Sequence, residues 1–109
     1  MPDLSPSLRT LRDLIAIPSV NPMGRDDLPA EIVGEHAMAE DVAERLRRLG
    51  LDASLVGSDG RTSVIAEAIA GPAAETMLVA SHIDTVPVDG MEIDPFDPVV
   101  EGDRILAVS

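Results

Sequence analysis

Apolar residues recur at helical spacing near the start of the chain. Leu8, Leu11, Leu14 and Ile15 form one stripe, which predicts a helix that Ser5 or Ser7 caps. Pro18 ends this pattern, and residues 17–29 carry three prolines and one glycine. The composition of these residues predicts a loop that reverses the chain.

A second apolar stripe predicts a longer helix from about Pro29 to Leu49. Gly50 is placed to end it in a left-handed cap. Glu35 is among the charged residues expected largely outside the apolar face. The apolar positions of this helix are Ile32, Val33, Ala39, Val42, Ala43, Leu46 and Leu49.

The pattern then changes to one typical of strands. The stretches "LDASLVG" and "RTSVIAEAIAG" are β-like and are joined by "SDG", which predicts a hairpin. The run "ETMLVAS", residues 75–81, is continuously apolar apart from its ends, which predicts a strand covered on both faces. Helix, helix, hairpin and buried strand together predict one α/β layered domain over residues 1–109.

The amino-acid composition argues against some classes of binding partner and some kinds of metal site. Twenty acidic residues against eight arginines and no lysine give a net charge of −12, which argues against nucleic acid and anionic membranes as partners. The chain has no cysteine, so a metal site would use imidazole and carboxylate ligands. No leader-like start and no apolar run of membrane-spanning length is present, which predicts a soluble cytoplasmic protein.

The stretch "LVASHIDTVPVDG", residues 78–90, holds the candidate chemistry. His82 and Asp84 are two residues apart on a predicted strand, so their side chains should project together at its carboxyl end. A carboxylate beside a histidine fixes the tautomer of the ring, as at many metal ligands. A purely structural His–Asp pair is the alternative that this dyad alone leaves open. Ser81 should point away from His82, which argues against a serine hydrolase.

A longer stretch carries a family resemblance. Residues 80–105, "ASHIDTVPVDGMEIDPFDPVVEGDRI", resemble the segment around the first metal ligand of the zinc-dependent aminoacylase, acetylornithine deacetylase, succinyl-diaminopimelate desuccinylase and glutamate carboxypeptidase family. The stretches "LIAIPSVNP" and "VAERLRRLGLDASL" also look like parts of that family, so the resemblance covers nearly the whole chain. The matching motif residues are His82, Asp84, Val86, Pro87, Gly90, Asp94, Pro95 and Phe96.

The resemblance implies a fold and an activity. The fold would be the three-layer α/β/α sandwich with a mixed sheet, here truncated. His82 would bind one of two zinc ions, which cobalt or manganese could replace, and Asp84 would orient this ligand and support the catalytic base. Substrates would be N-acyl amino acids or small peptides, and the intact family also forms homodimers.

The chain departs from the family in two places. Met91 stands where the family often has tryptophan, and after "EGDRI" the family's bridging aspartate, Glu-Glu pair and further ligands are missing. Because a catalytic zinc needs about three protein ligands, residues 1–109 are expected to be an inactive amino-terminal part of one catalytic domain, with weak or no zinc binding. The alternative is a non-catalytic interaction module, or half of a split protein. His36, Asp89, Asp94 and Asp97 are not expected to be ligands.

Overall fold

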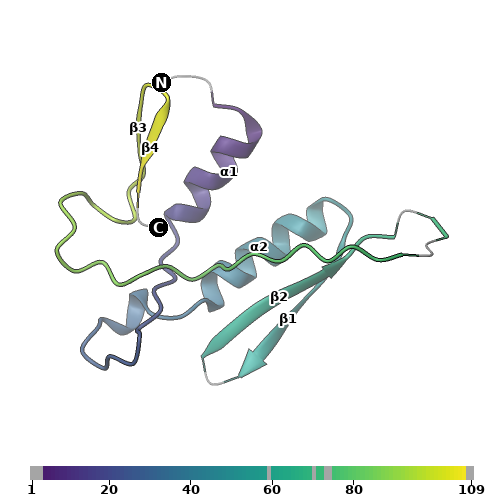
Figure 1. Ribbon diagram of the computed structural model, residues 1–109, viewed down its shortest axis with the longest axis horizontal. Helices are drawn as coiled ribbons and strands as arrows, with labels where there is room; N and C mark the ends of the chain where they lie inside the picture. Colours follow the sequence, from purple (N-terminus) through teal and green to yellow (C-terminus); the bar gives the residue numbers. More distant parts are fainter. Residues whose placement is uncertain (1–3, 59, 70, 73–74, 108–109) are drawn as a thin grey trace.

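The computed structural model describes residues 4–107 except 59, 70, 73 and 74. Two helices and two separate two-stranded antiparallel sheets make up its regular structure (Figure 1). The elements in chain order are α1 (Pro6–Ile15), a 3-10 helix (Ala30–Ile32), α2 (His36–Arg48), β1 (Asp52–Ser58), β2 (Arg61–Glu67), β3 (Val99–Glu101) and β4 (Arg104–Leu106).

This arrangement is not the three-layer α/β/α sandwich that the resemblance implied. A three-layer fold needs one sheet of several strands with helices on both of its faces. Here β1 pairs only with β2 and β3 only with β4 among the described residues, so no larger sheet is formed. The expectation of a mixed sheet is therefore wrong for this structure.

The predicted buried strand at residues 75–81 is also wrong. This segment runs past α2 and β2 in Figure 1 but forms no strand. Met77, Leu78 and Val79 keep 85, 87 and 82% of their surfaces exposed. Apolar composition favours burial, but a strand forms only where a neighbouring strand accepts its main-chain hydrogen bonds.

The first predicted helix is confirmed. The second, predicted from about Pro29 to Leu49, is interrupted and forms two shorter elements. The Ser5 side chain caps α1 by accepting a 3.3 Å hydrogen bond from the backbone N–H of Leu8. Pro29 to Leu49 contains a single 3-10 turn and then α2, because Gly34 between them adopts a φ of +95°, which no α-helix contains. Gly50 follows α2 with a φ of +89°, as its predicted cap role requires.

The predicted hairpin is confirmed as β1 and β2, although Asp59 of its turn lies outside the described residues. Helix α2 packs against both strands, and Ala39, Ala43 and Ala53 are buried in this contact. Because these side chains are small, the helix backbone lies close to the sheet. Val56 and Ile65 remain 42 and 54% exposed, so one face of the hairpin is left largely uncovered.

Val20 joins three segments that are distant in sequence. It forms parallel bridges to Val33 on one side and to Thr85 on the other, and its side chain is fully buried. The N–H of Val20 donates to Ile32 O at 2.9 Å, and the N–H of Thr85 donates to Ser19 O at 3.0 Å. These bridges hold residues 83–85 beside the start of α2, which sets the position of the His82–Asp84 pair.

No helix within the described ranges combines the length and the apolar character that crossing a membrane requires.

Candidate functional site

His82 and Asp84 lie in contact, although the strand on which the sequence placed them is not formed. His82 Nδ1 is 3.2 Å from Asp84 Oδ1 and 2.9 Å from the carbonyl oxygen of the same residue. The side chain of His82 is 82% exposed, whereas that of Asp84 is 26% exposed. The imidazole is therefore held at one nitrogen and open to solvent over most of its surface.

The partners of His82 define its tautomer. A carbonyl oxygen and a carboxylate oxygen only accept hydrogen bonds, so the Nδ1 atom of the neutral ring must carry the proton. The Nε2 lone pair is then free, and Nε2 forms no hydrogen bond or ion pair with the described residues. This is the form in which histidine binds a metal ion or accepts a proton.

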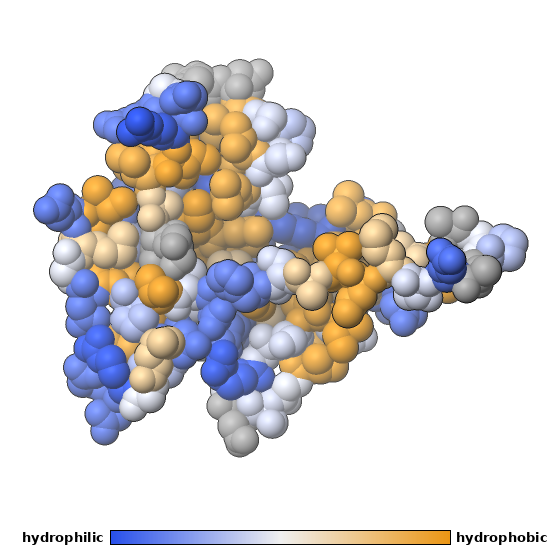
Figure 2. All heavy atoms as spheres, viewed as in Figure 1, coloured by the Kyte–Doolittle hydropathy of each residue, from blue (hydrophilic) through white to orange (hydrophobic). Residues whose placement is uncertain are grey.

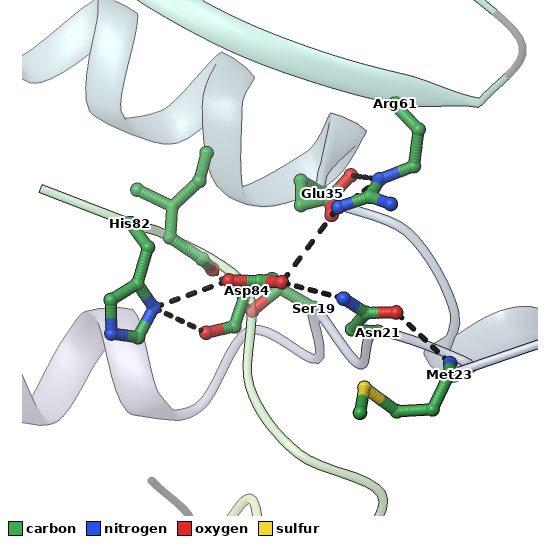
Figure 3. A network of polar contacts seen from close by, with 8 residues as sticks. Ser19, Asn21, Met23, Glu35, Arg61, His82 and Asp84 are labelled. Atoms are coloured by element: carbon green, nitrogen blue, oxygen red, sulfur yellow. Dashed lines mark hydrogen bonds and ion pairs between the residues drawn. The ribbon is translucent and has the colours of Figure 1, made fainter.

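Asp84 is itself fixed by two residues from distant segments (Figure 3). Asn21 Nδ2 donates to Asp84 Oδ2 at 2.9 Å, and Arg61 Nη2 lies 3.7 Å from the same oxygen. The hydrogen bond from Asn21 is the main reason that the pKa of Asp84 is lowered, with His82 making a smaller contribution. Asp84 is therefore ionised at neutral pH and presents one oxygen to the histidine.

Glu35 is the buried anchor of this network. It is only 3% exposed, and it accepts hydrogen bonds from Arg61 Nε at 2.8 and 3.1 Å. A buried carboxylate requires such a partner because desolvation of an unpaired charge is costly. The hydrogen bond to Glu35 also raises the pKa of Arg61, so this guanidinium remains charged beside Asp84.

His36 has a different environment. Its Nε2 atom is paired with Glu40 one turn along α2, and its Nδ1 atom is 3.3 Å from Thr62 Oγ1. Both ring nitrogens therefore have partners within the chain. His36 differs in this respect from His82, whose Nε2 forms no hydrogen bond within the described residues.

The loop carboxylates also have structural partners. Arg25 binds Asp27 and Asp89, with Nη1 2.8 Å from Asp89 Oδ1, and these hydrogen bonds lower the pKa values of both aspartates. Asp94 Oδ1 accepts a 3.1 Å hydrogen bond from the backbone N–H of Phe96, which is a turn contact. The Arg25 ion pairs and the Asp94 turn contact both hold loop residues in place.

The described residues do not assemble a complete metal site. No group of three histidine, cysteine, aspartate or glutamate side chains in them is placed to hold one ion. His82 fits the part of a single ligand, with Asp84 as the residue that orients it. A catalytic zinc site needs about two more protein ligands.

An open groove of about 670 Å³ adjoins the pair. Residues 61–66 of β2 form one side, residues 78–84 form the other, and Val42 and Leu46 of α2 contribute apolar side chains. His82 and Asp84 are both among its lining residues. The imidazole therefore borders a concave surface.

Ser19, Asn21, Glu35 and Arg61 were not predicted as site residues. The Ser19 hydroxyl donates to Ile83 O at 2.8 Å and so helps to hold the segment that carries His82 and Asp84. Sequence periodicity placed Glu35 largely on the polar side of a helix, whereas it is buried. The "PSVN" stretch stood out in the sequence only through the family resemblance, so no local signal identified these residues.

Comparison with known proteins adds no family assignment. The chain matches no family model, no curated protein and no solved structure. The family named from the resemblance therefore remains a prediction.

Proposed function

We propose that His82 and Asp84 form one ligand and its orienting carboxylate in the site of a metal-dependent hydrolase of N-acyl amino acids or small peptides. The observation that carries this proposal is the contact of Asp84 with Nδ1 of His82, which leaves Nε2 exposed. The other ligands would come from residues outside this sequence, because the described part of the chain offers no group of three. The protein would act in the cytoplasm.

Each residue of the network would have a defined part. Asp84 would hold the His82 ring in the tautomer that presents Nε2. Asn21 favours the ionised form of Asp84, and Asn21 and Arg61 hold its carboxylate in place. When bound, zinc, cobalt or manganese supplies Lewis acidity toward water and the scissile carbonyl. The network of this chain prepares one coordinating atom for that metal.

A zinc titration followed by NMR tests the ligand role directly, because the chain has two histidines. The ring signals of His82 should respond at about tenfold lower zinc concentration than those of His36, whose nitrogens are engaged. Asp84→Ala should reduce this preference. Equal responses of the two rings would contradict the ligand role. Stoichiometric binding of zinc by this chain at micromolar affinity would contradict the proposal that its metal site is incomplete.

The hydrolase activity needs a separate test. The genomic sequence after codon 109 is examined for a bridging aspartate and a glutamate pair, and the joined protein is assayed on N-acetyl amino acids with added zinc. His82→Ala should abolish the activity, and Asp84→Ala should lower kcat/KM by about 10- to 100-fold. Activity that survives His82→Ala would refute the assignment.

A non-catalytic interaction module is the second candidate. The exposed apolar side chains of Met77, Leu78 and Val79 favour it, because soluble chains seldom leave such a run uncovered. Under this proposal the contact between His82 and Asp84 would have only a structural role and would help to hold the chain in place next to Thr85. The assay of the joined protein separates the two candidates, since a purely structural pair predicts no metal-dependent activity that His82→Ala abolishes.

A further inference from the structure

Glu35 lies at the start of α2 but does not cap the helix. It directly precedes the first helical residue, His36, and its side chain forms no cap hydrogen bond within the described ranges. Its carboxylate is instead buried and accepts hydrogen bonds from Arg61, the first residue of β2. The contact that accounts for the burial of this carboxylate is therefore the one with Arg61.

Glu35 fixes the plane of the Arg61 guanidinium. Arg61 Nε lies 2.8 and 3.1 Å from the two carboxylate oxygens of Glu35, and Arg61 Nη2 lies 2.8 Å from Oε1. Two nitrogens held by one buried partner give the planar group a defined orientation. In that orientation Nη2 also lies 3.7 Å from Asp84 Oδ2. Because the Arg61 side chain is 58% exposed, it would be free to leave Asp84 without this partner.

Arg61 and Asn21 act on the same oxygen of Asp84 (Figure 3). Asn21 Nδ2 donates to Oδ2 at 2.9 Å, and the charge of Arg61 lies beside that oxygen. The other oxygen, Oδ1, is 3.2 Å from His82 Nδ1. A carboxylate can turn about one hydrogen bond, and a second contact from a different segment restrains that rotation. Contacts at Oδ2 therefore decide which oxygen faces the imidazole.

The contact between α2 and the hairpin has ties other than this ion pair. Ala39 and Ala43 of α2 are buried against the strands, and Arg47 Nη2 donates to Ala53 O at 3.0 Å. Arg61 lies at the turn end of the hairpin, where Figure 2 shows hydrophilic residues, with hydrophobic residues farther along. Burial of a charge costs desolvation, and apolar replacement of a buried ion pair is often neutral or stabilising.

We infer that Glu35 is a positioning residue of the His82 site and acts through Arg61. It holds the guanidinium beside Asp84, so that Oδ1 of this carboxylate stays turned toward the imidazole. The buried ion pair thus serves the site more than the stability of the fold. The inference rests on the proposed function for the role of His82 as a metal ligand, and it adds a residue that acts on this ligand through two others.

Two variants test the role of the ion pair. Glu35→Met combined with Arg61→Met removes both charges, so that no buried charge is left unpaired. Arg61→Lys keeps a cation for Glu35 but lacks the planar group that reaches two carboxylates at once. Glu44→Met combined with Arg48→Met is the matched control, because this exposed ion pair within α2 joins no residue of the site network in the described part of the chain.

Three measurements on the purified chain are compared. Three-bond NMR couplings give the side-chain rotamer of Asp84, and the side-chain amide signals of Asn21 report its hydrogen bond to Asp84 Oδ2. A zinc titration gives the concentration at which the His82 ring responds. Urea unfolding gives the stability of each variant.

Both variants at Arg61 should replace the single Asp84 rotamer by a mixture and shift the Asn21 amide signals. The His82 ring should then need about three- to tenfold more zinc for the same response. The urea midpoint of the double methionine variant should equal or exceed that of the unaltered chain. The control pair should leave the Asp84 rotamer unchanged and alter the zinc concentration by less than about twofold.

A single Asp84 rotamer and an unchanged zinc response in both variants would overturn the inference. A large drop in the urea midpoint of the double methionine variant would also overturn it, because the ion pair would then serve the fold. Failure of the proposed function appears in a different comparison, as equal zinc responses of His82 and His36 in the unaltered chain. The rotamer and amide measurements involve no metal, so they decide the positioning role of Glu35 in either case.

Discussion

Asn21 Nδ2 donates a 2.9 Å hydrogen bond to Asp84 Oδ2 across 63 residues of sequence. This bond links the loop after α1 to the segment that presents His82 (Figure 3). Because Asn21 is the largest contributor to the lowered pKa of Asp84, the loop favours the ionised form of the carboxylate that contacts the imidazole. The bond depends on the Val20 bridges, which bring the two segments together.

Replacement of Asn21 should raise the pKa of Asp84. Asn21→Ala removes the hydrogen bond that favours the ionised form, and Asn21→Asp adds a second carboxylate and should raise the pKa further. Carboxyl-carbon NMR during a pH titration measures both effects. Asp89, which Arg25 holds, is the internal control and should titrate as in the unaltered chain. An unchanged Asp84 titration in both variants would show that Asn21 does not control this carboxylate.

Stability should fall under acidic conditions. The pKa values of Asp27, Asp84 and Asp89 are lowered in the folded chain, by Arg25 for two of them and by Asn21 for Asp84. A lowered folded-state pKa contributes stability above the unfolded value of about 3.9, and this contribution is lost as pH falls through the folded-state pKa. Urea unfolding at pH 7 and near pH 3 measures the difference. Arg25→Gln should reduce it, and an equal pH dependence in that variant would be inconsistent with the Arg25 contacts.

Val20→Ala should destabilise the chain by about 2 kcal/mol, because it deletes fully buried methyl groups at the junction of three segments. Val86→Ala is the matched control, since Val86 is 53% exposed and its truncation should cost less than about 0.5 kcal/mol. Urea unfolding of the three proteins gives both values. Equal losses in the two variants would mean that the junction is not the core of the fold.

Gly57→Ala should disrupt the hairpin. An added Cβ would lie 2.0 Å from the carbonyl oxygen of Arg61, on a backbone with a φ of +138°. Gly60 has a φ of +77° but meets nothing within 4 Å, so Gly60→Ala should cost only about 1 kcal/mol. Amide hydrogen exchange across β1 and β2 compares the variants. A hairpin that Gly57→Ala leaves as protected as Gly60→Ala does would contradict the described backbone.

Local patterns predicted the elements that depend on local interactions. The α1 stripe with its Ser5 cap and the β1–β2 hairpin follow from side-chain spacing and turn composition. The helix from Pro29 failed at Gly34, whose positive φ the apolar periodicity did not register. The strand at residues 75–81 failed because composition indicates a preference for burial and does not supply the neighbouring strand.

In the candidate site, too, the sequence predicted a local contact but not the contacts between distant segments. The contact between His82 and Asp84 was expected from their two-residue spacing on a strand. The contact is present, but residues 75–81 form no strand, so the reasoning behind the prediction was only partly right. Asn21, Glu35 and Arg61 come from three other segments, and only the Val20 bridges and the buried ion pair bring them together. Local sequence periodicity does not indicate which distant segments come together.

The protonation state of the His82 ring tests the central claim most directly. Long-range proton–nitrogen NMR spectra, recorded at a pH where the ring is neutral, assign the proton to one nitrogen, and Asp84→Ala provides the comparison. The contacts of Nδ1 with Asp84 predict a proton on Nδ1 and a free lone pair on Nε2, with the population moving toward Nε2–H in the variant. A proton on Nε2 in the unaltered chain would contradict the claim that the contacts with Asp84 prepare His82 as a ligand.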